Sequence, residues 1–219
     1  MLLVTGALSA LTVPPALARL TDTDALGGNT FGTAASFTAT VTLYLKTSGP
    51  GNVASSPVLP LTAVAPTVAT LPNYDTNRDS SAGLSVTAGG TDATTVEKSH
   101  QVWSQTQPTG GLVLAGNATL TLWSSMKDFR DRRGVVTAYL RECTPADVCT
   151  TFDTVTVDVA NWSGGTANFV SKSFDFGAVN RTIAAGQKLH VRVVVGKLAA
   201  DDMWFAYDTT THPTRLVIG

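Results

Sequence analysis

The segment NYDTNRD, at 73–79, gathers oxygen-bearing side chains in a chain that uses charge sparingly. Only 14% of the 219 residues are Asp, Glu, Lys or Arg. Asp75, Asn77 and Asp79 stand at alternate positions, which is the spacing of the first three calcium ligands in an EF-hand loop. The glycine at the sixth position and the glutamate at the twelfth position of that loop are missing. The segment is therefore not an EF-hand, although it keeps the oxygen ligands that calcium prefers.

A calcium site built on this segment needs further carboxylates from a distant part of the chain. We favour the adjacent pair Asp201 and Asp202, because two neighbouring acids repel each other and a bound cation relieves that repulsion. Asp208 is a competing donor, since its Tyr-Asp-Thr context repeats the context of Asp75. In the alternative interpretation, these aspartates cap turns by accepting hydrogen bonds from nearby backbone amides. The sequence thus predicts Ca²⁺ as a cofactor and leaves turn capping open.

Two of the four tryptophans, Trp103 and Trp162, stand next to predicted loops. In a carbohydrate-binding module, exposed aromatic rings stack on sugar faces beside polar groups. These two residues are therefore the candidates for a ligand-binding platform. Trp123 and Trp204 lie inside apolar runs and are expected in the core.

Cys143 and Cys149 are the two cysteines of the chain, and five residues separate them. In an exported chain such a pair is expected to form a disulfide across the tip of a hairpin. A two-cysteine metal site is the weaker alternative, because the sequence offers no partner ligands at a fitting spacing.

The residues that catalysis needs do not assemble into a sequence motif. The sequence contains no Gly-x-Ser-x-Gly elbow, and nothing marks the two glutamates, Glu97 and Glu142, as a glycosidase pair. His190 alternates with apolar neighbours in a β-rich run, so we expect its side chain to face solvent. We predict that the chain is not an enzyme and has no catalytic residues, with a hydrolase as the least favoured function.

Short β-strands are expected to position these side chains. The first strand covers 35–45, where apolar and polar residues alternate as on a half-buried strand. The following stretch, 47–72, holds five of the ten prolines and is predicted to be an extended linker or arm. A strand separated in this way can join its own sheet or complete the sheet edge of a neighbour. Self-association through strand 35–45 is therefore one predicted outcome.

From residue 73 onward, β-rich runs alternate with turn signals, one of which is Gly116-Asn117. The 34 threonines are β-branched and polar, which suits the solvent faces of strands. Many short strands in a domain of this size favour an all-β fold, namely a jelly-roll antiparallel β-sandwich. The runs expected to form its strands are 84–87, 112–123, 135–141, 152–159, 168–176, 189–195, 203–207 and 214–218.

The first 18 residues are apolar and end in Ala-Leu-Ala, which is typical of a secretory signal with cleavage after Ala18. No Lys or Arg precedes Arg19, so the usual positive n-region is absent, and a buried apolar N-terminal helix is the alternative. The segment is too short and proline-broken to span a membrane, so we expect no membrane span after its removal. The net charge of −1 gives no electrostatic reason to bind nucleic acid.

Three resemblances extend these expectations. The sequence RLTDTDALGGNTFGTAASF resembles the start of TasA/camelysin-type secreted proteins, which implies export to a cell surface or matrix. The order GNATLTLW, FVSKSFDFG and AGQKLHVRVVV is similar to galactose-binding-like jelly rolls, such as the non-catalytic C-terminal domains of X-Pro dipeptidyl-peptidase-type hydrolases. The pair PNYDTNRD…GLSV and DDMWFAYDTTTHPTRL resembles a family of secreted actinobacterial proteins with TasA-like signals.

Taken together, the residues and resemblances predict a non-catalytic β-sandwich protein, secreted to the cell surface or extracellular matrix. We expect it to be stabilised by calcium and to assemble by N-terminal strand exchange. A carbohydrate-binding module that recognises a glycan is the alternative function. The expected organisation is a signal-like segment at 1–18, an N-terminal strand at 19–46, a Pro-rich arm at 47–72 and a galactose-binding-like jelly roll at 73–219.

Overall fold

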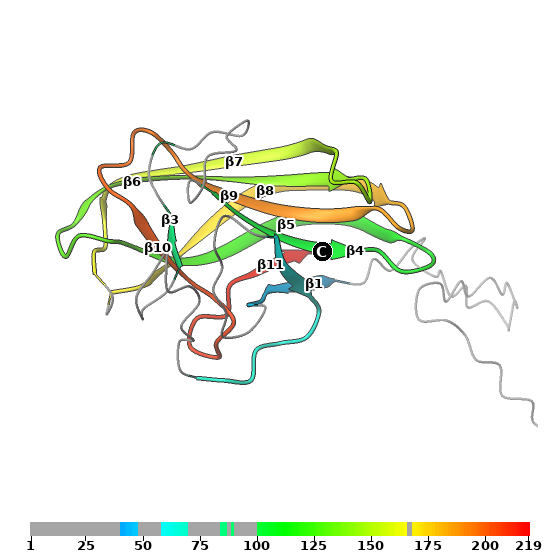
Figure 1. Ribbon diagram of the computed structural model, residues 1–219, viewed down its shortest axis with the longest axis horizontal. Coiled ribbons are helices and arrows are strands. Elements are labelled where there is room, and N and C mark those ends of the chain that lie inside the picture. The colour runs from blue at the N-terminus through cyan, green and yellow to red at the C-terminus, as the bar shows by residue number, and fades with distance from the viewer. Residues whose placement is uncertain (1–39, 48–57, 70–83, 87–88, 90–99, 166–167) are drawn as a thin grey trace, which may run out of the picture. The chain divides into compact units, whose positions relative to one another are not determined.

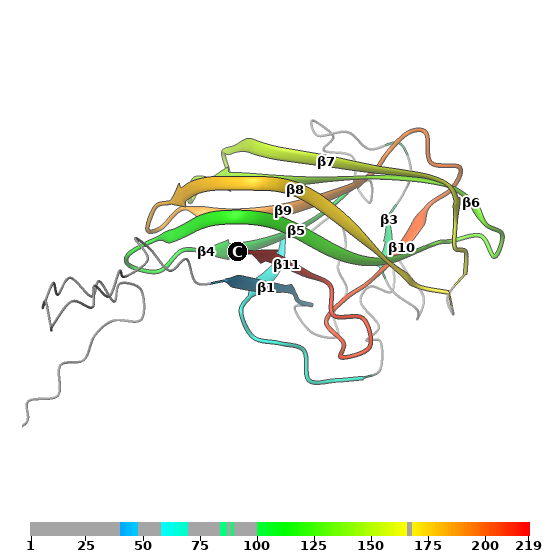
Figure 2. The same cartoon turned by 180° about the vertical axis from the view of Figure 1, so that it is seen from behind.

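The regular structure of the described residues consists of β-strands. The computed structural model describes residues 40–47, 58–69, 84–86, 89, 100–165 and 168–219, which form eleven strands, β1 to β11 (Figures 1 and 2). Within these residues, a search for helices long and apolar enough to cross a membrane finds none. The prediction of an all-β fold is confirmed. Asp75, Asn77 and Asp79 lie outside the described residues.

The first layer is organised around β5 (Leu112–Met126). One edge of β5 pairs along most of its length with β8 (Val170–Ile183). The opposite edge pairs with two short strands in succession, β11 (Arg215–Ile218) and then β10 (Met203–Ala206). All of these pairs are antiparallel. The outer strands of the layer are β1 (Val41–Leu45) beside β11 and β3 (Leu84–Val86) beside β10.

The second layer has the strand order β2, β4, β9, β6, β7. Strands β2 and β4 are parallel, so the predicted antiparallel sandwich is corrected to a mixed one. Because β1 also pairs with β2, the two layers are parts of one sheet that curls over itself. The bounds are β2 (Val58–Thr62), β4 (His100–Thr106), β9 (Lys188–Val195), β6 (Arg132–Cys143) and β7 (Cys149–Trp162).

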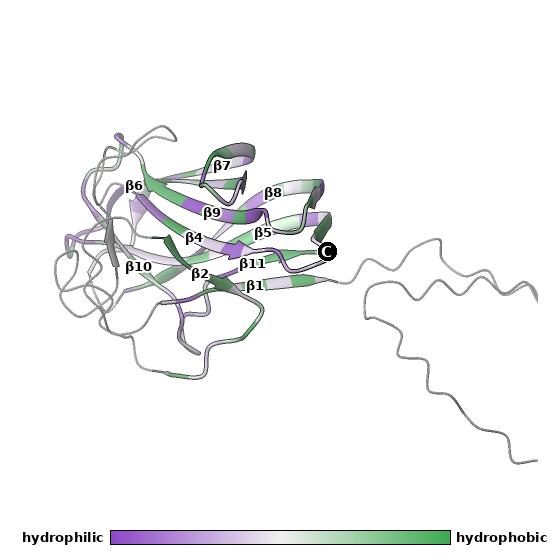
Figure 3. Ribbon diagram, turned by 45° about the vertical axis from the view of Figure 1, so that its right-hand side comes forward, coloured by the Kyte–Doolittle hydropathy of each residue, from purple (hydrophilic) through white to green (hydrophobic). Residues whose placement is uncertain are grey.

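The hydrophobic core fills the space between the layers. Along β5, Leu120 and Leu122 are fully buried, whereas the threonines beside them are only half-buried. This period of two follows from the pleat of a strand, which sends successive side chains to opposite faces. Figure 3 colours the strands by hydropathy, and hydrophobic and hydrophilic stretches alternate along several of them. Trp103 of β4 meets Tyr207, which follows β10, in an edge-to-face contact with ring centroids 5.1 Å apart. This aromatic pair ties the second layer to the first.

Strands β1 and β2 correct the predicted separation between an N-terminal strand, a linker and a sandwich. Leu43 and Leu45 of β1 are buried in the common core, and so are Leu59 and Leu61 of β2. The predicted linker at 47–72 thus contains a sheet strand. Its alternation of Leu with Val, Pro and Thr buries one face. Pro60, one of the five prolines that suggested an arm, is tolerated in a short strand with few ladder bonds.

The expected turn at Gly116-Asn117 is replaced by continuous strand, because both residues lie inside β5. The register between β5 and β8 shifts two residues further on, between Ala118 and Thr119, where β8 contains one additional residue, Phe176. Gly116 has a φ of +131°, and a Cβ there would lie 2.7 Å from the backbone of Gly219. Glycine is therefore required at this position because the backbone has a positive φ and the C-terminal residue passes close to it. The glycine that predicted a turn thus permits the close approach of two backbone segments, and β5 continues through it.

The pairing of β1 with β11 predicts the outcome of a cross-linking experiment. Thr42 and Val217 are register partners and both are half-buried, so cysteines at these positions should oxidise to a disulfide within one chain. Non-reducing electrophoresis of Thr42→Cys/Val217→Cys should show a cross-linked monomer, and neither single variant should show it. A cross-linked dimer would instead mean that β1 is exchanged between two copies.

Candidate functional site

The predicted calcium donors Asp201 and Asp202 have protein partners. Asp201 Oδ1 accepts a hydrogen bond from the Asp202 backbone amide at 2.8 Å. Asp202 Oδ2 lies 3.4 Å from Lys127 Nζ, and the Asp202 carbonyl accepts a hydrogen bond from the Lys127 amide at 2.9 Å. These contacts are those of a capped turn, the alternative interpretation of the sequence. The calcium site itself stays a prediction, because its other ligands lie outside the described residues.

The competing donor, Asp208, is nearly buried and holds the end of β1. Its carboxylate forms an ion pair with Lys46 and accepts a hydrogen bond from the Thr47 amide at 3.0 Å. Its φ of 59° places it in the left-handed region that aspartate tolerates in turns. Leu84, the first residue of β3, pairs with Phe205 of β10, so the start of β3 lies at the Asp208 end of β10.

The proposed sugar platform is wrong for both tryptophans. Trp103 and Trp162 have no exposed surface, and a ring without exposed surface cannot stack on a sugar. Trp162 lies against Gly134, where a Cβ would sit 2.5 Å from the ring. Its indole N–H donates to the Ser124 carbonyl at 3.4 Å. Both residues belong to the core. The prediction failed because a residue that stands next to a loop in the sequence can still be buried. Of the two expected core residues, Trp204 is buried and Trp123 is half-buried.

At one end of the sandwich, three loops form an exposed surface. We define the loop end as residues 127–131, 163–165 and 197–202, three loops that come together at the left of Figure 1. Backbone hydrogen bonds join them: Met126 donates to Ser163 at 2.7 Å, Gly165 donates to Met126 at 2.7 Å, and Lys127 donates to Asp202 at 2.9 Å. Three segments distant in sequence are thus held as one surface.

Phe129 is the most exposed large apolar side chain recorded for the described residues, at 80%. Its ring lies against Gly165, where a Cβ would come within 2.6 Å of it. Leu198, in the third loop, is 56% exposed. Asp128 and Arg132 form an ion pair of 2.7 Å in the same region. The loop end therefore combines exposed apolar side chains with charged ones, a combination typical of ligand-binding surfaces.

The opposite end of β6 carries the second candidate site, which we call the cysteine corner: Cys143, Asp147, Cys149, Lys188 and His190. The expected disulfide between Cys143 and Cys149 is present, and it joins register partners of β6 and β7. Because it closes a short loop, chain-entropy arguments give it only about 2–3 kcal/mol of stabilisation. Twelve residues of β6 place the corner about 36 Å from the loop end.

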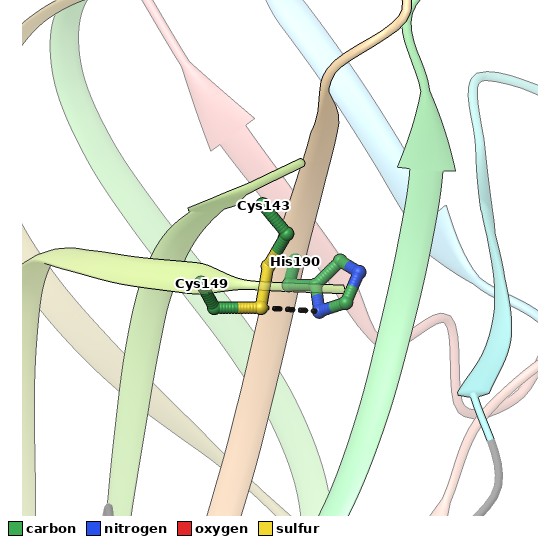
Figure 4. A group of neighbouring side chains, drawn as sticks. All are labelled: Cys143, Cys149 and His190. Atoms are coloured by element: carbon green, nitrogen blue, oxygen red, sulfur yellow. Dashed lines mark hydrogen bonds between the residues drawn. A yellow bond between two sulfur atoms is a disulfide. The ribbon is translucent and has the colours of Figure 1, made fainter. Parts of the chain in front are cut away.

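His190 lies inside the corner and does not face solvent as expected. It is 3% exposed, and its Nδ1 lies 3.7 Å from Cys149 Sγ (Figure 4). Its Nε2 lies 3.8 Å from Asp147 Oδ1, and the same carboxylate oxygen is 2.7 Å from Lys188 Nζ. The expectation failed because β9 is covered on both faces, so alternation along β9 does not identify a solvent face.

Burial lowers the pKa of His190 to about 4, since a charged imidazole would lose its hydration. Asp147 opposes this shift by attracting the charged form, whereas Arg141 and Lys188 add to it by repulsion. The imidazole is therefore neutral at pH 7 and has a lone pair available on one nitrogen.

A small recess lies along the seam between β7 and β8 and has a volume of about 170 Å³. Its lining includes Arg181, which donates to Glu142 Oε2 at 2.6 Å and lies over the ring of Phe152. Glu142, one of the two glutamates of the chain, is thus held in an ion pair. Its carboxylate serves to join β6 to β8.

The buried histidine predicts a specific pH dependence of stability. The folded pKa of about 4 lies below the unfolded value of 6.5, so the unfolded chain takes up the proton first as pH falls. Stability is therefore full above pH 6.5 and is lost progressively down to pH 4. Between pH 7 and pH 4.5, the free energy of unfolding of His190→Gln should fall by about 2–3 kcal/mol less than that of wild type. Urea unfolding at the two pH values measures this difference.

His212→Gln is the control for this measurement. Burial also lowers the pKa of His212, but this residue is less buried than His190, so its replacement should have a smaller effect. Equal pH dependence in wild type and His190→Gln would show that the imidazole is not buried in its neutral form.

Comparison of the sequence with protein-family profiles gives no match, and comparison with curated proteins gives none either. The fold does have solved counterparts. An aminopeptidase from a marine sediment Thaumarchaeota archaeon is similar over 83% of this chain, with a TM-score of 0.61 and 10% identity. A CocE/NonD family hydrolase from Staphylococcus aureus is similar over 82%, with a TM-score of 0.57 and 12% identity.

An α-amino acid ester hydrolase is similar over 81% of this chain, with a TM-score of 0.54 and 11% identity. The chain spans only 35–37% of the length of these three hydrolases. The expected resemblance to β-domains of hydrolases is therefore supported at the level of the fold. At such low identity the similarity concerns the fold alone, and the described chain has a β-sandwich architecture similar to part of these hydrolases.

Proposed function

We propose that this chain is a non-catalytic β-sandwich domain of an exported protein, located at the cell surface or in the extracellular matrix. The observation that carries the proposal is the extent of the structural similarity. It covers more than four-fifths of this chain but only about a third of each hydrolase. A domain that corresponds to one part of several larger enzymes suits an accessory role in binding or assembly.

Two further features support export. The Cys143–Cys149 disulfide is a bond that persists in oxidising compartments and is rare in the cytosol. The apolar segment 1–18 has the small-x-small ending of a cleavable signal. Neither feature depends on the fold comparison, so they are independent reasons for the proposed location.

Expression of the full chain with a C-terminal tag in a secreting bacterium tests this location. The tagged protein should appear outside the cytoplasm with Arg19 as its first residue, as determined by mass spectrometry. Ala18→Trp should block cleavage, because the residue before the scissile bond must be small, whereas Leu17→Trp at the neighbouring position should not. Cytoplasmic protein that begins at Met1 and has free thiols would contradict export.

Strand exchange is the finer part of this proposal. The pairing of β1 with β11 and β2 is the contact that two copies would have to exchange. Opening it would expose Leu43 and Leu45, which are buried, at a cost of about 2–3 kcal/mol for each side chain. We therefore propose that exchange takes place while the sandwich is folding, before β1 pairs with β11 and β2 of its own chain.

Carbohydrate binding is the second candidate function, and Phe129 is the observation that favours it. Its ring is 80% exposed and supported from one side by Gly165, so stacking would cost little side-chain entropy. Charged groups of the loop end stand nearby to bond sugar hydroxyls. In this proposal the loop end takes the place of the two buried tryptophans.

The glycan proposal predicts that wild type is retained on at least one of the insoluble polysaccharides cellulose, chitin and xylan. Phe129→Ala should weaken this retention by about tenfold, the value of one aromatic stack. Val64→Ala is the matched control, because Val64 is 68% exposed but is not part of the loop end. Equal retention of Phe129→Ala and wild type, or no retention at all, would count against the loop end as a sugar site.

A further inference from the structure

The cysteine corner brings three metal-ligating atoms together from three neighbouring strands. Within the part of the chain that the structure describes, Cys143, Cys149 and His190 are the one group of three such residues found close together. Their sulfur and nitrogen atoms all lie within 4.8 Å of one another. The strands β6, β7 and β9 fix this arrangement through their backbone pairing. Figure 4 shows the imidazole directed at the sulfur of Cys149.

The spacing of these atoms fits a tetrahedral zinc ion. Zinc binds thiolate sulfur at about 2.3 Å and imidazole nitrogen at about 2.0–2.1 Å. Tetrahedral angles then place a sulfur and a nitrogen ligand about 3.6 Å apart, and His190 Nδ1 lies 3.7 Å from Cys149 Sγ. The two sulfurs would separate to about 3.8 Å by side-chain rotation once the bond between them is broken.

The surroundings of the second ring nitrogen of His190, Nε2, also resemble those of a metal-bound histidine. Metal-bound histidines almost always donate their other ring N–H to a carboxylate or carbonyl. His190 Nε2 is buried and makes no hydrogen bond, and Asp147 Oδ1 stands 3.8 Å away. A side-chain movement of less than about 1 Å would complete this hydrogen bond. Lys188 holds the carboxylate in place from the other side at 2.7 Å.

We infer that the reduced cysteine corner is a zinc site in which Cys143 Sγ, Cys149 Sγ and His190 Nδ1 bind the ion and water takes the fourth position. The disulfide and the zinc are mutually exclusive. A dithiol reductant transfers two electrons and two protons to the Cys143–Cys149 bond and becomes a disulfide itself. Zinc then displaces one proton from each thiol, and these two protons pass to solvent.

The chemistry of the three ligand atoms indicates which metal the corner would take. Soft sulfur and nitrogen ligands select Zn²⁺ over Ca²⁺, so this site is distinct from the calcium site predicted from the sequence.

Cobalt substitution in the full chain tests the inference. The chain is reduced with a water-soluble phosphine, which takes its oxygen from water, and is then titrated anaerobically with Co²⁺ alone. Reduced wild type should bind one Co²⁺ with a thiolate-to-metal charge-transfer band, which Zn²⁺ should remove by displacement. The oxidised chain should show no band. Cys149→Ser should abolish the band, and His190→Gln should weaken binding at least tenfold.

Two further variants test whether the metal ion is bound by the arranged residues of the cysteine corner or only by two free thiols. Asp147→Asn should weaken cobalt binding about tenfold through the orientation of His190, and His212→Gln, outside the corner, should bind as wild type does. Circular dichroism of each reduced variant shows whether the sheet is retained. Absence of the band in reduced wild type, or equal binding by wild type and His190→Gln, whether folded or not, would overturn the inference.

Discussion

The structure depends on satisfying both edges of the long strand β5. Its backbone amides and carbonyls lie in the interior of a sheet, where unpaired groups are costly. One edge is satisfied by β8, which is almost as long. The other edge needs two short strands in succession, β11 and β10, and the loop between them contains Asp208, which anchors the end of β1 through Lys46. Closure of the sandwich through β1 and β2 thus follows from the requirements of one strand.

The two candidate sites lie at opposite ends of β6, and their properties differ because their surroundings differ. At the loop end, three tight connections leave apolar side chains exposed on a backbone that hydrogen bonds between the loops hold together. At the cysteine corner, three paired strands enclose a neutral imidazole beside sulfur. The first arrangement is suited to contact with an external surface, and the second to holding a small ion. A rigid sheet between them positions each site independently.

Much of the fold could be predicted from period-two alternation. All eight of the β-rich runs beyond residue 73 correspond to strands, although their ends differ. Strand β4 was missed because its sequence HQVWSQT is largely polar, yet His100 and Gln101 are buried with it. Strand β2 was missed because its proline suggested a linker. In both cases the sheet supplies the partners and the burial, and neither can be read from local composition.

The candidate sites show the same division between what the local sequence predicts and what the tertiary structure decides. The sequence by itself determined the disulfide, because two cysteines so close in an otherwise cysteine-free chain have each other as partners, and it determined the all-β class, because alternation is a local property of the chain. Only the tertiary structure decided that Trp103 and Trp162 are buried, that Phe129 is exposed and that His190 stands beside Cys149. Those outcomes depend on which segments become neighbours although they are far apart in the sequence, and strand pairing is a property of the whole sheet.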